Sequence, residues 1–148
     1  MEYNNKSFQF VKYHTCLAYM FEPAEIVFIM RMMELEFMKL NGYKVEWTRA
    51  EYMKHMGLTT YSFDKCIKSL CDLKLLSKKN NNLGNRVYYS FDGTLYNRLL
   101  TILHATRNAD VLISFCNINF KQNSRTISSI TDEEIVTLRN TKKYKYNR

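Results

Sequence analysis

Residues 59–73, TTYSFDKCIKSLCDL, carry side chains that suit binding to a phosphate backbone. At about 100° per residue in a helix, one narrow sector contains Tyr61, Lys65, Lys68 and Asp72. The apolar side chains fall on the opposite side: Phe63, Cys66, Ile67 and Leu70. Hydroxyl groups and helix N-terminal N–H groups suit phosphate oxygens, and lysine reaches phosphates or guanine acceptors. The predicted contact residues of this helix are Thr59, Thr60, Tyr61, Ser62, Lys65 and Lys68.

Cationic and amide side chains gather again in residues 75–91. In a hairpin they would lie along a nucleic-acid backbone or reach into a minor groove. The predicted contact residues here are Lys78, Lys79, Asn81, Asn82, Asn85 and Arg86. A third group forms a basic tail at the end of the sequence: Lys142, Lys143, Lys145 and Arg148.

The net charge of +8 is concentrated in two places. Residues 59–90 carry six basic and two acidic side chains, a net +4, and residues 139–148 carry five basic and no acidic ones. The remaining residues, 11 basic and 12 acidic, have a net charge of −1. A basic stripe and a basic tail are typical of a surface that binds a polyanion, whereas a generally basic protein spreads its charge.

Side chains that could act in catalysis or bind a metal are scattered. The sequence contains no glycine-rich phosphate loop, nucleophile elbow or metal-ligand spacing around its histidines, which are His14, His55 and His104. The cysteines form no Cys-x-x-Cys pair, which predicts free thiols in a reducing compartment: Cys16, Cys66, Cys71 and Cys116. We expect no enzymatic activity, no cofactor and no metal ion.

Proline, glycine and capping residues divide the first half of the chain. Pro23 and Gly42 bracket one long helix that ends at Leu40, and the alternation in residues 45–47 predicts a short strand. A Thr-x-x-Glu capping box at residue 48 predicts a helix over residues 49–56, which Gly57 ends. Thr59 is a favourable N-cap for the helix that continues to residue 73.

The second half begins with a hairpin. Two β-favouring runs over residues 75–91, with Gly84 at the turn, predict its strands, and a helix follows Gly93 to about residue 105. Residues 109–120 fit either a helix or a strand, and residues 121–129 read as a polar linker. Thr131 and Glu134 form a second capping box, which predicts a short helix ending near Arg139.

This order of helices and hairpin resembles the winged helix-turn-helix family. That family's turn and recognition helix typically place glycine, an aliphatic residue and Ser or Thr before a polar stretch, an apolar position and a later leucine. The matching residues are Met56, Gly57, Leu58, Thr59, Phe63, Ile67, Leu70 and Leu75. The resemblance implies a mainly helical α+β fold with a small β-hairpin wing, and double-stranded DNA binding through the recognition helix 59–73 and the wing 75–91. The resemblance covers about residues 10–105. We expect a winged helix-turn-helix domain over residues 1–105, followed over residues 106–148 by a C-terminal extension with a short helix and the basic tail.

A weaker resemblance concerns replication proteins. Residues 10–12, Phe-Val-Lys, are similar to a short motif that often precedes the long first helix in N-terminal domains of phage and plasmid replication initiators and of primosomal replication proteins. The resemblance implies a role in replication initiation or transcription control in a phage or plasmid setting. Since no segment approaches the roughly 18 apolar residues of a membrane span and the first residues lack a signal-peptide pattern, we expect a cytoplasmic protein without membrane partners.

A second class of function stays open. The helix over residues 23–40 has two apolar stripes, so it either forms the centre of the fold or also faces a partner. A winged helix can dock a protein or a second copy through this helix or through the aromatic N-terminal arm. Asp64 and Asp72 lie on or beside the lysine face and favour that alternative. The cations also have ordinary structural explanations: Lys65 and Lys68 can form a solvated helix face, and the hairpin cations can protect a strand edge from pairing.

Overall fold

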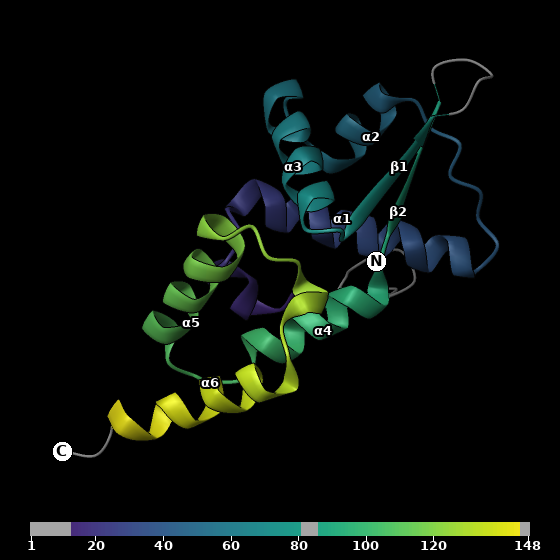
Figure 1. Ribbon diagram of the computed structural model, residues 1–148. Coiled ribbons are helices and arrows are strands. Elements are labelled where there is room, and N and C mark those ends of the chain that lie inside the picture. Colours follow the sequence, from purple (N-terminus) through teal and green to yellow (C-terminus); the bar gives the residue numbers. More distant parts are fainter. Residues whose placement is uncertain (1–12, 81–85, 146–148) are drawn as a thin grey trace, which may run out of the picture.

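The computed structural model describes residues 13–80 and 86–145 of the chain. The fold is mainly helical with one two-stranded antiparallel hairpin, which confirms the predicted mainly helical α+β class. In chain order the elements are η2 (Thr15–Tyr19), α1 (Pro23–Leu40), α2 (Arg49–Met56), α3 (Thr60–Asp72), β1 (Leu76–Asn80), β2 (Val87–Phe91), α4 (Gly93–Leu103), α5 (Ala109–Cys116), η3 (Asn117–Gln122), η4 (Ile127–Ser129) and α6 (Asp132–Lys145) (Figure 1). Three helices followed by a hairpin give the layout of a winged helix.

Local capping places α2 and α3 as the sequence predicts. Thr48 Oγ1 accepts a hydrogen bond from the Glu51 N–H at 3.3 Å, and the Thr48 N–H donates to Glu51 Oε1 at 3.2 Å. Gly57 then adopts φ +67°, a left-handed conformation that glycine takes without steric cost, and so ends α2. Thr59 Oγ1 accepts from the Ser62 N–H at 3.2 Å and starts α3.

The hairpin lies against α1. One edge of β2 pairs with β1, with Leu76 opposite Phe91 and Lys78 opposite Tyr89. On the other edge, the Tyr89 carbonyl accepts from Lys39 Nζ at 2.8 Å and the Phe91 N–H donates to Glu36 Oε1 at 3.1 Å. Side chains of α1 therefore satisfy backbone groups that a further strand would otherwise pair. The predicted turn residue Gly84 lies outside the described residues.

The predicted strand over residues 45–47 is wrong. Between this segment and the rest of the described chain, the Val87 N–H donates to the Trp47 carbonyl at 3.1 Å, beside an isolated bridge between Thr48 and Arg86. Thr48 is already the N-cap of α2, so the chain turns into the helix after a single contact with β2. Farther along β2, the side chains of Glu36 and Lys39 of α1 form hydrogen bonds to the backbone of this edge.

The C-terminal extension is more helical than predicted. Residues 109–122 form α5 and η3, a π-helical continuation, because the Asn108 side chain caps α5 by accepting from the N–H groups of Asp110 and Val111. The predicted end of the last helix near Arg139 is wrong, since α6 continues to Lys145. No glycine or proline interrupts residues 132–145, and Asn140 does not take up a left-handed conformation that would stop the helix. The predicted linker contains the short 3-10 turn η4 with a buried Ile127.

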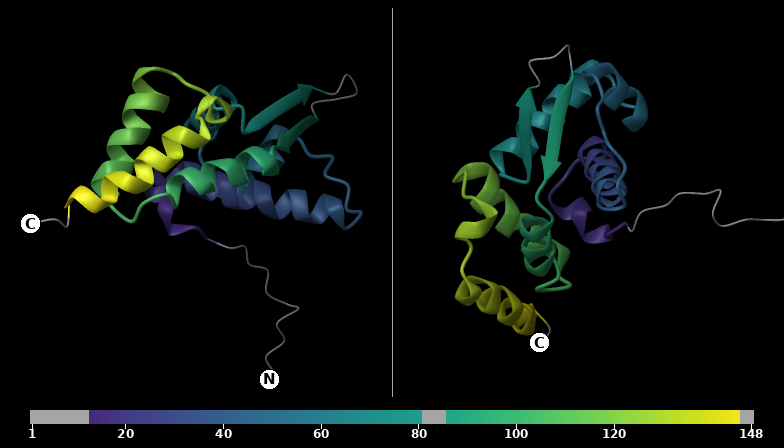
Figure 2. Two further views of the ribbon diagram at one scale, coloured as in Figure 1. Left: turned by 60° about the horizontal axis from the view of Figure 1, so that its bottom comes forward. Right: turned by 90° about the vertical axis from the view of Figure 1, so that its right-hand side faces the viewer.

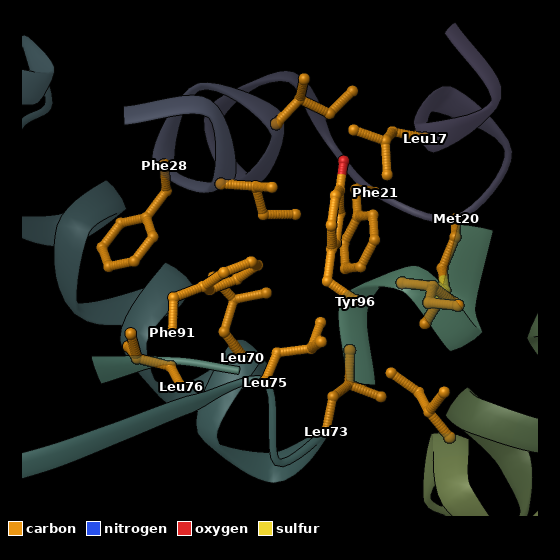
Figure 3. Packing of buried hydrophobic residues seen from close by; sticks show 14 of the residues in the cluster. Leu17, Met20, Phe21, Phe28, Leu70, Leu73, Leu75, Leu76, Phe91 and Tyr96 are labelled. Atoms are coloured by element: carbon orange, nitrogen blue, oxygen red, sulfur yellow. The ribbon is translucent and has the colours of Figure 1, made fainter. Parts of the chain in front are cut away.

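A single buried cluster joins the elements. Figure 3 shows Leu17 and Phe21 facing Leu70, Phe91 and Tyr96 across it. Burial of each such side chain stabilises the fold by about 1.5–3 kcal/mol. The extension contributes its own buried side chains to this cluster: Leu112, Cys116, Phe120, Ile127, Ile130, Ile135 and Leu138. The predicted boundary at residue 105 stays a prediction, with residues of the same cluster on both sides of it.

Figure 2 shows how the extension covers the first part of the fold. α5 packs on η2, and η4 packs on α4. The C-terminal end of α6 lies at the opposite end of the molecule from the hairpin in both figures. No helix in residues 13–80 or 86–145 has the length and apolar character needed to cross a membrane.

Candidate nucleic-acid interface

Helix α3 buries one face and presents the other to solvent. Phe63, Cys66 and Leu70 are at most 1% exposed, whereas Tyr61 is 76% exposed and Lys68 is also exposed. This is the polarity that the apolar spacing of the sequence predicts. Phe63 packs against Phe28 of α1 with ring centroids 5.6 Å apart, so α1 supports the helix from behind.

Different elements flank the two sides of α3. Ser69 Oγ donates to Glu25 Oε2 of α1 at 2.5 Å, which fixes one side of the helix. The hairpin flanks the other side, where β1 packs on α3. There, burial and then the charge of Asp72 raise the pKa of the Cys71 thiol, whereas the charges of Lys78 and Lys74 lower it. Since Ser69 and Cys71 are about 200° apart around a helix, the exposed stripe of Tyr61 and Lys68 projects between the two sides.

Asp64 faces solvent on the hairpin side and is paired with Arg49 of α2 in a salt bridge. The Arg49 guanidinium also lies 5.7 Å from the centroid of the Phe63 ring, in a cation–π arrangement. Arg49 therefore neutralises the carboxylate that counts most strongly against a phosphate-binding surface. Sequence reasoning missed this residue, because Arg49 lies in the charge-balanced first part of the chain and its partner lies 15 residues away.

Lys65 faces the other side of α3 and pairs with Glu22, whose Oε2 lies 3.4 Å from Lys65 Nζ. The hydrogen bond to Glu22, followed by the charge of that carboxylate, raises the pKa of Lys65. Both side chains are more than half exposed, so the pair is screened by solvent and opens at little cost. Glu22 was also missed, since 43 residues separate it from Lys65 and no local pattern connects them.

The hydroxyl groups predicted at the start of α3 differ in their availability. Thr59 Oγ1 acts as the helix cap, so it accepts from the Ser62 N–H instead of facing a ligand. Thr60 and Tyr61 are exposed, and Ser62 is half-buried. Thr60 and Tyr61 are therefore the ones best placed to reach a partner.

The hairpin places its two lysines on opposite faces. Lys78 shares a face with Tyr89, whose ring packs 6.1 Å from that of Phe63, so this face is turned toward α3. Lys79 shares the other face with Tyr88. Among the described residues, no carboxylate lies within 4.0 Å of either ammonium group or of Lys68.

Of the other predicted hairpin residues, the structure describes only Arg86. Arg86 is exposed and bridges to Thr48 through its backbone. The remaining predicted contacts of the wing, Asn81, Asn82 and Asn85, lie outside the described residues. The structure thus brings Lys68, Lys78 and Arg86 onto the helix and hairpin that the sequence assigns to one surface.

The described part of the basic tail belongs to α6, away from the hairpin. Lys142, Lys143 and Lys145 belong to α6, and Arg148 lies outside the described residues. The end of α6 and the hairpin lie at opposite ends of the molecule (Figure 1). The two basic segments found in the sequence therefore form separate regions.

A groove of about 730 Å³ runs along α3 on the side away from the hairpin. Lys65, Lys68 and Asp72 line it from α3, and Lys121 lines it from η3. Phe120, buried next to Lys121, anchors this part of the extension in the core. Lys121 was not among the predicted contact residues, because the sequence alone does not indicate that η3 approaches α3.

The cysteine and histidine side chains are held in structural contacts. Burial raises the pKa of the Cys66 thiol to about 11 and that of Cys116 to about 12. His55 Nε2 lies 2.9 Å from Oε1 of the buried Glu34, and Cys16 Sγ lies 3.5 Å from His104 Nε2. Within the part of the chain that the structure describes, no three His, Cys, Asp or Glu side chains are grouped to hold a metal ion.

Comparisons with known proteins identify no relative of this chain. No family model matches the chain, and neither a curated protein nor a solved structure matches it. The geometry of α3, the hairpin and the adjoining groove is therefore the basis for assigning a function.

Proposed function

We propose that this protein binds double-stranded DNA, with α3 in the major groove and the hairpin along the phosphate backbone. The observation that carries the proposal is the exposed stripe of Tyr61 and Lys68 on a helix whose opposite face is completely buried, beside a hairpin whose Lys78 faces the same helix. A helix of about 10–12 Å diameter matches the roughly 12 Å width of the major groove.

The charge distribution supports the same assignment. The pairs Arg49–Asp64 and Lys65–Glu22 cancel locally, which leaves Lys68 of α3 and the hairpin cations for a phosphate to approach: Lys78, Lys79 and Arg86. Backbone phosphates supply most of the affinity in such a complex and position the protein, whereas Thr60 and Tyr61 at the start of α3 are the side chains that reach base edges. The resemblance to winged helices, together with the weaker one to replication initiators, supports a role in replication initiation or transcription control of a phage or plasmid. Such a role would be carried out in the cytoplasm.

The test is a titration of fluorescent random-sequence duplex DNA, followed by anisotropy at about 0.05–0.2 M salt. Lys68→Ala with Lys78→Ala is expected to weaken binding at least about tenfold and to flatten the dependence on salt, because two phosphate contacts are lost. The control is Arg107→Ala with Arg139→Ala, which removes the same charge from exposed positions outside α3 and the hairpin. Equal binding by the two double variants would exclude the proposed surface.

A second candidate function is docking of a protein partner on α1. Phe37 is 66% and Leu40 86% exposed at the end of this helix, and Tyr43 follows them at 51%. Light scattering with the same DNA titration separates the two candidates. A dimer that ignores duplex DNA at low salt, and that Phe37→Ser with Leu40→Ser converts to a monomer, would favour docking.

A further inference from the structure

The C-terminal extension approaches the proposed DNA surface on the side that the hairpin leaves open. Ser69 and Glu25 mark that side of α3, and the groove between α3 and η3 lies along it. A helix in the major groove has a sugar-phosphate strand on each side. In the proposed complex the hairpin covers one of these strands, and the groove side of α3 faces the other.

Lys68 and Lys121 meet on this groove from elements about fifty residues apart in sequence. Both side chains are exposed, and within the described residues no carboxylate lies within 4.0 Å of either ammonium group. Arg125 also lines the groove, but its guanidinium is bound to Glu134 at 2.6 and 2.8 Å. Lys65 lines the groove as well, but it is paired with Glu22. Lys68 and Lys121 are therefore the lysines of the groove that have no carboxylate partner among the described residues.

The segment that carries Lys121 is held in place. The Asn119 side chain donates to the Phe115 carbonyl at 2.9 Å and accepts from Arg125 Nη1 at 2.8 Å. Phe120 is 7% exposed and packs edge-on against Phe115. A cation on such a fixed backbone loses less conformational entropy on binding than one on a free loop.

We propose that Lys68 and Lys121 hold one backbone phosphate of the bound duplex in the groove between α3 and η3. This inference rests on the proposed function and extends its surface to residues 106–148. Two carboxylates also line the groove and repel phosphate: Asp72, the last residue of α3, and Glu25 of α1, whose Oε2 accepts from Ser69. The contact therefore lies at Lys68 and Lys121, away from the end of α3.

The experiment compares Lys121→Ala, Lys121→Arg and the control Arg107→Ala in the same anisotropy titration. Lys121→Ala is expected to weaken duplex binding about three- to tenfold and to lower the slope of log K against log salt by about one, whereas Lys121→Arg retains binding. Because Lys68 and Lys121 would share one phosphate, the double alanine variant is expected to weaken binding by less than the product of the single effects.

The outcomes distinguish this inference from the proposed function. If Lys78→Ala weakens binding while Lys121→Ala matches Arg107→Ala in affinity and salt slope, the groove does not contact the duplex and the helix and hairpin alone bind it. If the unmodified protein does not bind duplex DNA at low salt, both proposals are overturned. Multiplicative effects of Lys68→Ala and Lys121→Ala would exclude a shared phosphate.

Discussion

At the level of single residues, Asp64 is the carboxylate that most opposes the proposed binding of α3 to a phosphate backbone. Its carboxylate lies on the exposed side of the helix and is 54% exposed even in its salt bridge with Arg49. The pair cancels two charges that would otherwise act in opposite directions on DNA. Removing the carboxylate therefore has a double effect, because it abolishes a repulsion and frees Arg49 to contact phosphate.

We predict that Asp64→Asn strengthens binding to random-sequence duplex about threefold or more at 0.1 M salt. The free energy of unfolding should fall by less than about 1 kcal/mol, since exposed ion pairs contribute little. Anisotropy titration and urea unfolding measure the two effects, and Glu133→Gln, an exposed carboxylate on α6, is the matched control. Weaker binding by Asp64→Asn would mean that the Arg49–Asp64 pair shapes the binding surface.

The sequence predicts which face of α3 is exposed, because helical periodicity depends only on neighbouring residues. It does not predict the partners of Asp64 and Lys65. Arg49 and Glu22 meet α3 only after α1 and α2 have packed on it, 15 and 43 residues away in the chain. The sequence therefore predicts that Tyr61 and Lys68 are exposed, but it does not predict which charges on α3 are cancelled by salt bridges.

At the level of elements, the helix starts follow from local sequence and their ends follow less well. Capping boxes at Thr48 and Thr131 place the beginnings of α2 and α6, since side chain and backbone satisfy each other within four residues. The predicted end of α6 near Arg139 is wrong because no glycine or proline stands there to end the helix. The strand expected before Thr48 failed because α1 side chains, which sequence reasoning cannot locate, cover the edge of β2.

The start of α6 also gives a prediction about pH. Hydrogen bonds from Arg125, followed by the Thr131 backbone N–H, lower the pKa of Glu134 from 4.5 to about 2. Because this pKa is lower in the folded protein, the charged carboxylate stabilises the fold above about pH 4.5, and that contribution disappears as the pH falls toward 2.

We expect Glu134→Gln to melt at a lower temperature than the unmodified protein at pH 6–7. The difference in Tm should shrink between about pH 4.5 and 2, where Glu134 becomes protonated in the unmodified protein. Circular dichroism at 222 nm, recorded across this range, measures the difference. A gap in Tm that stays constant down to pH 2 would show that the loss comes from altered packing and not from the carboxylate charge.

At the level of the whole molecule, the extension and the winged-helix part share a core. Leu112 of α5 is completely buried, and α5 packs on η2, which precedes α1 in the chain. The extension therefore does more than bring Lys121 near α3, since it also covers apolar surface of the first part. Shared packing of this kind favours one cooperative unfolding transition over two separate ones.

The single tryptophan makes this cooperativity measurable. Trp47 lies next to α2, with its ring centroid 5.3 Å from that of Tyr52 and 5.0 Å from that of His55, so its fluorescence reports on the winged-helix part. Far-UV circular dichroism reports on all helices together.

We predict that Leu112→Ala lowers the free energy of unfolding by about 2–5 kcal/mol and shifts both urea midpoints equally, because the cavity destabilises one common core. If the fluorescence midpoint stays unchanged while the circular dichroism curve becomes biphasic, residues 106–148 form a separately folding unit. The groove between α3 and η3 would then be an interface between two units, and DNA binding could depend on whether they are docked.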